Sequence, residues 1–111
     1  MKFNPSMLVG LAILAIPASA SAATDSNKLI THLGVQSGLA YLNFSTTIPN
    51  STSNNLSVAC PGGNVYIDTT TDFGKGLLAI ALAARQNNII LSRIDYTQDA
   101  SGNCQASLIE I

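Results

Sequence analysis

The chain has 111 residues, of which 47% are hydrophobic and only 10% are charged, and its formal net charge is −1. This length corresponds to one small domain, and five scattered Lys and Arg residues cannot form the basic face that nucleic-acid binding requires. With one histidine and two cysteines, the chain has few of the residues that form a classical metal site or a nucleophilic triad. We therefore expect no nucleic-acid partner, no metal and no cofactor.

The first 22 residues have the pattern of a cleaved export signal. Lys2 precedes an apolar run over Met7–Ile16, and small residues with two A-x-A frames follow, of which we favour the second, with cleavage after Ala22. The apolar run is too short to cross a hydrocarbon core of about 30 Å as a helix. The predicted domains are a signal peptide over 1–22 and a single domain over 23–111, in a bacterial protein that is periplasmic or secreted and has no membrane span after cleavage.

The residues that precede the single predicted helix show mainly strand patterns. A polar segment with proline over 48–55 has the composition of a loop, and Pro61-Gly62-Gly63 forms either a tight turn or a bulge in one bent strand. The predicted strands are Lys28–Val35, Leu39–Thr47, Leu56–Cys60 and Asn64–Asp68.

The helix is predicted over Phe73–Asn87. Residues 69–72, Thr-Thr-Thr-Asp, offer N-cap candidates, and Asn87-Asn88 can close the helix in the left-handed conformation. The side chains expected against the sheet are Phe73, Leu77, Ile80, Ala81 and Ala84.

The same helix is apolar around its whole circumference. Leu78 and Leu82 point away from the predicted sheet side, whereas a helix on a small sheet normally has one charged face. Either the loop 48–55 or the N-terminal segment covers them, or they form an oligomer interface between copies of the chain.

Two strands follow the helix, over Ile89–Thr97 and Cys104–Ile111, with a hairpin turn at 99–103 between them. The order is four strands, one helix and two strands, with short connections. We predict an α+β fold, a small curved sheet or antiparallel β-barrel that carries one apolar helix.

The two cysteines are expected to form a structural disulfide. Cys60 and Cys104 are the only pair in a chain predicted to be exported, and they have neither a C-x-x-C spacing nor cationic neighbours. His32 in a strand is typical of cross-strand packing, and no catalytic set can be assembled around it. The protein is therefore not expected to be an enzyme.

Short hydroxyl and amide side chains are frequent: Ser, Thr and Asn supply 27 of the 89 residues after position 22. Such a surface suits hydrogen bonding to neutral ligands such as sugars, and it is equally typical of an extracellular surface that is soluble without charge. If a sugar binds, Tyr41, Tyr66 or Tyr96 could provide the stacking face.

The C-terminal half resembles a known group of proteins. A cysteine-bearing strand, a helix GKGLLAIALAARQNN, a strand IILSRIDYT, a turn with SGNC and a last strand SLIEI are similar to the receptor-binding B subunit of subtilase cytotoxin and to typhoid-toxin and pertussis-like binding subunits. This resemblance implies an oligonucleotide/oligosaccharide-binding (OB) fold and a ring, often a pentamer, with helices lining its centre. It also implies recognition of sialylated cell-surface glycans by hydroxyl, acidic and aromatic side chains, and a toxic A-type partner subunit.

The function predicted from the sequence is an exported, disulfide-bonded binding module that recognises cell-surface glycans as a ring oligomer. The alternative is a periplasmic protein that binds and inhibits an enzyme or packs in an envelope assembly.

Overall fold

The computed structural model describes residues 21–44 and 56–111. Most of the predicted export signal and the predicted loop 48–55 therefore lie outside the described residues, while Ala22 falls within the first strand. The described elements are β1 (Ser21–Asp25), β2 (Ile30–Gln36), β3 (Leu39–Phe44), a 3-10 turn η2 (Pro61–Gly63), β4 (Val65–Asp68), α2 (Asp72–Asn87), β5 (Arg93–Gln98) and β6 (Cys104–Glu110).

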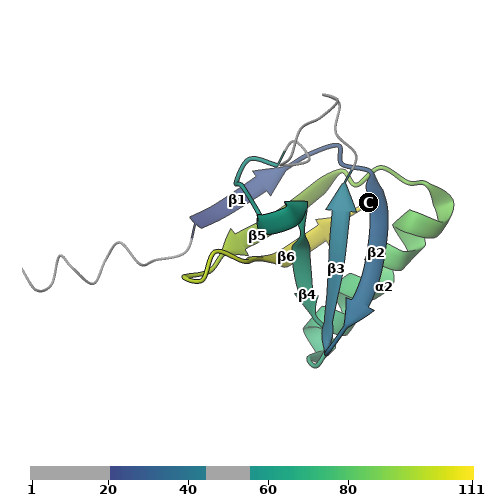
Figure 1. Ribbon diagram of the computed structural model, residues 1–111. Coiled ribbons are helices and arrows are strands. Elements are labelled where there is room, and N and C mark those ends of the chain that lie inside the picture. Colours follow the sequence, from purple (N-terminus) through teal and green to yellow (C-terminus); the bar gives the residue numbers. More distant parts are fainter. Residues whose placement is uncertain (1–20, 45–55) are drawn as a thin grey trace, which may run out of the picture.

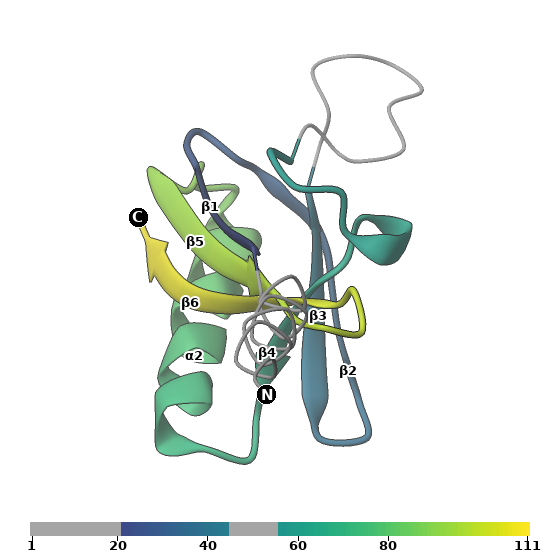
Figure 2. The same ribbon diagram turned by 90° about the vertical axis from the view of Figure 1, so that its left-hand side faces the viewer.

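The strands form one six-stranded sheet in the order β1-β5-β6-β4-β3-β2. All pairs are antiparallel except β4 with β6, so the sheet is mixed, and the prediction of a fully antiparallel barrel was wrong on this point. The two ends of the strand order, β1 and β2, are consecutive in the chain, and Lys28 between them bridges to Leu91 ahead of β5. The sheet is therefore strongly curved, with α2 against one side of it (Figures 1 and 2).

The β2–β3 hairpin follows from its turn residues. Ser37 and Gly38 both have positive φ, 51° and 79°, as a two-residue hairpin turn that matches the strand twist requires. The carbonyl of Gly38 accepts hydrogen bonds from the backbone N–H of Thr69 at 3.0 Å and from its hydroxyl at 2.7 Å. The hairpin tip is thus attached to the segment between β4 and α2.

The ends of α2 agree with the sequence prediction. Thr71 is the N-cap, and its hydroxyl accepts from the N–H of Gly74, while Asn88 ends the helix at φ 53° and ψ 42°. The buried residues of α2 are Gly74, Leu77, Ala81 and Ala84.

The predicted sheet-facing side of the helix was partly wrong, because Phe73 is 63% exposed and Ile80 is 37% exposed. The reason is Gly74, where a Cβ would lie 1.6 Å from the carbonyl oxygen of Asp68. Glycine allows the helix backbone to approach this strand end closely, and that approach sets the rotation of α2 about its axis.

Two predicted strand segments were also wrong. Residues 56–60 form no strand, because Ser57 N–H is bonded to the Asp25 carboxylate and Val58 N–H to the Tyr96 hydroxyl instead of to a neighbouring strand. β5 begins at Arg93 rather than at Ile89, which is 38% exposed.

The core lies between α2 and the inner side of the curved sheet. Its largest fully buried side chains are Tyr96, Phe44, Ile30, Leu42, Ile67, Leu91, Ile94, Val65 and Cys104. A disulfide joins Cys60 to Cys104, as expected from the sequence, and ties the segment before β4 to the start of β6. In the described ranges no helix has the length and apolar character needed to span a membrane.

Candidate functional site

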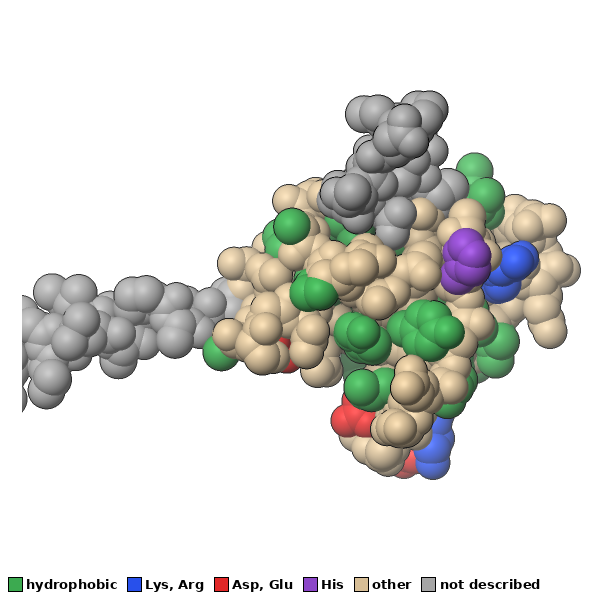
Figure 3. Space-filling view, viewed as in Figure 1, with side chains coloured by type: hydrophobic (Ala, Val, Ile, Leu, Met, Phe, Trp, Pro, Cys, Tyr) green, Lys and Arg blue, Asp and Glu red, His purple; other side chains and the backbone are tan. Residues whose placement is uncertain are grey.

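A pocket of about 380 Å³ lies on the outer side of the sheet, which faces away from the buried core. Its lining comes from the β2–β3 hairpin, from β4 and from the start of β6. The lining residues are Gln36, Ser37, Leu39, Tyr41, Asn64, Tyr66, Asn103 and Gln105. Hydrophobic side chains gather in the middle of this face in the space-filling view, with uncharged polar surface around most of them and acidic side chains at their lower edge (Figure 3).

The strand register brings the central pocket residues into one row. Tyr41 of β3 is paired with Gly34 of β2 on one side and with Tyr66 of β4 on the other, and Tyr66 is paired with Gln105 of β6. Because side chains alternate across a strand, these residues share the outer face, whereas Ala40 and its alternating neighbours are buried. The sheet thereby joins residues that are more than 60 positions apart in the sequence.

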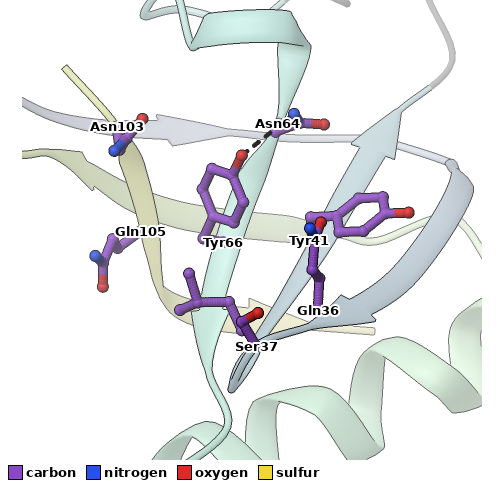
Figure 4. Close-up of a pocket in the computed structure, with 8 residues that line it drawn as sticks. Gln36, Ser37, Tyr41, Asn64, Tyr66, Asn103 and Gln105 are labelled. Carbon is purple, nitrogen blue, oxygen red and sulfur yellow. Dashed lines mark hydrogen bonds between the residues drawn. The ribbon is translucent and has the colours of Figure 1, made fainter.

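A chain of hydrogen bonds orients the Tyr66 hydroxyl. Asn43 donates from Nδ2 to Asn64 Oδ1 and to the carbonyl of Gly63, which sets the Asn64 amide so that its own Nδ2 donates to Tyr66 Oη at 3.4 Å (Figure 4). The Tyr66 hydroxyl accepts in this bond, so its own hydrogen can be donated to a ligand.

Two turns carry polar residues at the edge of the pocket. The hairpin turn after Gln36 carries Ser37, and the β5–β6 turn carries Asn103. In that second turn the Asp99 carboxylate accepts from the N–H groups of Ser101 and Asn103, both at 3.0 Å. Bonds from Ser101 and Asn103 lower the pKa of Asp99, so the turn is held by a carboxylate that is charged at neutral pH.

None of the residues that line the pocket is Asp, Glu, Lys, Arg or His. Asp68 lies at its rim, because it is paired with Leu39 and follows Tyr66 by two positions on the same face. The hydroxyl and N–H of Thr70 lower the pKa of Asp68 by hydrogen bonding, so this rim carboxylate is negative. Lys75 and Arg85 belong to α2, on the other side of the sheet.

The structure separates the three tyrosines that the sequence singled out. Tyr41 and Tyr66 are neighbours in the pocket, but Tyr96 is fully buried on β5, so its ring has no exposed face for a ligand. Its hydroxyl donates to Asp25 Oδ2 at 2.5 Å and accepts from Val58 N–H at 3.2 Å. Burial, with the Asp25 bond, raises the pKa of Tyr96 to about 12.

Asp25 completes this buried cluster. Its carboxylate also accepts hydrogen bonds from the hydroxyl and the N–H of Ser57. Burial raises the pKa of Asp25, but the bonds from Ser57 and Tyr96 lower it by more, so the pKa is below its usual value. The cluster fastens β1 to β5 and to the segment before η2, which is a structural role.

The two leucines predicted as an oligomer interface have different environments. Leu82 is 40% exposed, whereas Leu78 is half-buried and packs against the core. Phe73 and Ile80 of α2 are exposed as well, on the flank of the helix opposite to Leu82. His32 is exposed on β2 opposite Asn43 and has no acidic partner among the described residues.

Sequence reasoning missed most of the pocket. Gln36, Ser37, Leu39, Asn64, Asn103 and Gln105 were not predicted as site residues, and only the alternation of 39 with 41 and of 64 with 66 could have placed some of them on one face. Within 21–44 and 56–111 no group of three His, Cys, Asp or Glu residues is arranged to hold a metal ion.

The sequence matches no family model, and no curated protein or solved structure is significantly similar to it. The resemblance to toxin B subunits therefore stays a prediction.

Proposed function

We propose that this protein is an exported binding module whose pocket between β2, β3, β4 and β6 takes an uncharged sugar of a cell-surface glycan. One observation carries the proposal: two tyrosines are cross-strand neighbours on an exposed sheet face, and the other residues that line their pocket have amide, hydroxyl or apolar side chains. Sugars present hydroxyl groups and an apolar ring face, and this combination of side chains complements both.

We further propose that the domain is an OB-type barrel, as the resemblance implied. The support is the three-stranded antiparallel run β2-β3-β4, the helix between β4 and β5, and the parallel contact of β4 with β6. OB-folds bind oligosaccharides and oligonucleotides on the face of their second and third strands, between the loop after strand 1 and the loop before strand 5. Counted from β2, these are β3, β4, the Ser37-Gly38 turn and the 99–103 turn, which form or border the pocket.

Charge favours sugars over nucleic acids at this face. Nucleic-acid binding depends on Lys and Arg contacts to phosphates, and no pocket residue is cationic. The Asp68 carboxylate at the rim repels phosphate further.

We also propose that the protein self-associates through α2. The support is the exposed side chains of Phe73, Ile80 and Leu82 on a helix that packs against the side of the sheet opposite the pocket. Contacts through α2 would leave every pocket accessible, and several shallow pockets on one assembly gain avidity of about 10²–10⁴-fold on a glycan-bearing surface.

Export is part of the same proposal, since a structural disulfide persists in oxidising compartments. In a bacterial host, the protein recovered from the periplasm or medium should have the intact mass of Ala23–Ile111 minus two hydrogens. A mass that corresponds to residues 21–111 would show that cleavage follows the first A-x-A frame, and the mature protein would then contain the whole of β1. A mass that retains Met1 would contradict export.

A glycan array tests the binding function, with the wild-type protein and Gln105→Ala as the pocket variant. Gln105 is an exposed pocket residue, and Gln86→Ala on the exposed surface of α2 is the matched control. We expect the wild type and Gln86→Ala to bind the same neutral glycans and Gln105→Ala to bind them more weakly. Absence of glycan binding by the wild type, together with tight capture of a periplasmic enzyme, would favour the inhibitor function instead.

A further inference from the structure

The ring of Tyr41 lies directly over Gly34. A Cβ built at Gly34 would lie 2.4 Å from both Cζ and Oη of Tyr41 and 2.6 Å from its Cε1, far inside van der Waals contact. Figure 4 shows the ring pointing away from Tyr66 and across β2. The end of the tyrosine therefore occupies the space that any other residue at position 34 would need for its side chain.

The two tyrosines consequently play different parts in the pocket. The Tyr66 ring points along β4 toward Asn64, which holds its hydroxyl by a hydrogen bond (Figure 4). No hydrogen bond is formed by the Tyr41 hydroxyl within the described residues, so the position of this ring depends on packing against the bare backbone of β2. Glycine at position 34 is what allows the ring to lie flat on the sheet.

We propose that Gly34 is the positioning residue that makes Tyr41 a flat stacking platform for the apolar face of an uncharged sugar ring, an inference that rests on the proposed function. A ring packed on one side against Gly34 offers its other side to a ligand, beside the hydroxyl and amide groups that bind sugar hydroxyls. An acidic sugar is disfavoured at this place by the carboxylate of Asp68, which is paired with Leu39 of the pocket.

An aromatic ring over a glycine also stabilises a sheet by covering exposed backbone, without any ligand. The experiment has to separate these two roles. Gly34→Ala suits this purpose because φ at Gly34 is not positive, so alanine is compatible with the backbone, and the atoms in its way belong to the movable end of a side chain. The variant should fold with its Tyr41 ring displaced.

The test measures binding of a neutral array glycan and of its sialylated form by the wild type, Gly34→Ala, Tyr41→Ala and the double variant. The matched control is Gly76→Ala, because a Cβ at Gly76 meets nothing within 4 Å. We expect Gly34→Ala and Tyr41→Ala each to weaken binding of the neutral glycan roughly tenfold, the order of one aromatic contact. Gly76→Ala should bind like the wild type, and the sialylated form should bind more weakly than the neutral one.

The double variant shows whether Gly34 acts through Tyr41. If it does, Gly34→Ala has no further effect once Tyr41 is alanine, which a general loss of sheet stability would not reproduce. Wild-type affinity in Gly34→Ala, additive losses in the double variant, or preference for the sialylated form would overturn the inference and leave glycan binding intact. A wild type that binds no glycan would instead refute the proposed function itself.

Discussion

At the scale of single residues, chemically similar side chains have opposite roles because of where the sheet places them. Tyr66 and Tyr96 both have a hydroxyl in a hydrogen-bond network, but the hydroxyl of Tyr96 is buried with Asp25, whereas that of Tyr66 lies in the pocket. Substitutions that remove only the hydroxyl therefore separate stability from binding.

Tyr96→Phe should lower the free energy of unfolding by about 1–3 kcal/mol, because Asp25 loses a donor and Val58 N–H loses its acceptor. Tyr66→Phe is the matched control and should change stability by less than about 0.5 kcal/mol while weakening glycan binding. Urea unfolding of both variants measures the first effect and array binding the second. Equal losses of stability in the two variants would contradict the assignment.

The same buried cluster predicts how stability depends on pH. The pKa of Asp25 is lowered in the folded protein, so its contribution is present above about pH 4 and is lost as the pH falls further. The pKa of Tyr96 is raised to about 12, so its contribution is complete below about pH 10 and is lost as the pH rises toward 12. Urea midpoints across pH should show both declines, and Tyr96→Phe should remove the alkaline contribution of this residue.

At the scale of elements, close backbone approaches and the disulfide determine how the helix and strands are positioned, more than their local helix or strand propensities do. α2 meets the end of β4 through Gly74, and the parallel contact of β4 with β6 has only two paired positions, Val65 with Cys104 and Tyr66 with Gln105. The disulfide lies next to this short contact and joins its two sides.

Two glycines in the same helix provide an internal comparison. Gly74→Ala should cost about 3 kcal/mol or more, because its Cβ would lie 1.6 Å from the carbonyl oxygen of Asp68 and the helix would have to move. Gly76→Ala should raise the free energy of unfolding by about 0.5–1 kcal/mol, since no atom lies within 4 Å of the added Cβ. Thermal unfolding of both variants is the measurement, and a neutral Gly74→Ala would show that α2 does not approach β4 as described.

The disulfide is expected to support both stability and the pocket. Replacing Cys60 and Cys104 together by alanine should lower stability by about 2–5 kcal/mol, because the bond closes a loop of 44 residues. Asn103 and Gln105 flank Cys104 in the pocket, so glycan affinity should fall as well. Urea unfolding and array binding of the double variant check both effects. Unchanged affinity in a folded double variant would mean that β6 is held in place without the bond.

At the scale of the whole molecule, the sheet separates two surfaces. The pocket lies on its outer side, and α2, with three large exposed apolar side chains, packs against the inner side. This arrangement allows one surface to bind a ligand while the other contacts further copies of the chain.

Self-association through α2 predicts a closed oligomer in sedimentation experiments at micromolar concentration. Leu82→Glu should produce monomers, because a charge would replace an exposed apolar side chain in the contact, while Ser107→Glu at an exposed position of β6 should leave the oligomer intact. Ring and monomer should then differ in avidity for a glycan surface. A wild type that sediments as a monomer would refute this part of the proposal.

Much of the local structure could be predicted from the sequence. The N-cap within residues 69–72 and the left-handed helix end at Asn87-Asn88 each depend on a few neighbouring residues, and in the structure they lie at Thr71 and Asn88. The pairing of Cys60 with Cys104 was equally predictable, because the chain has no other cysteine.

Local periodicity and residue type were therefore enough to predict the helix, most of the strands and the disulfide, and they singled out Tyr41 and Tyr66, which line the pocket. The burial of Tyr96, the exposure of Phe73 and Ile80 and the position of Gly34 under Tyr41 follow instead from tertiary packing. The pocket belongs to this second group, because its lining residues meet only through the register of β2, β3, β4 and β6. A register pairs residues far apart in the chain, and no local pattern around either partner encodes it.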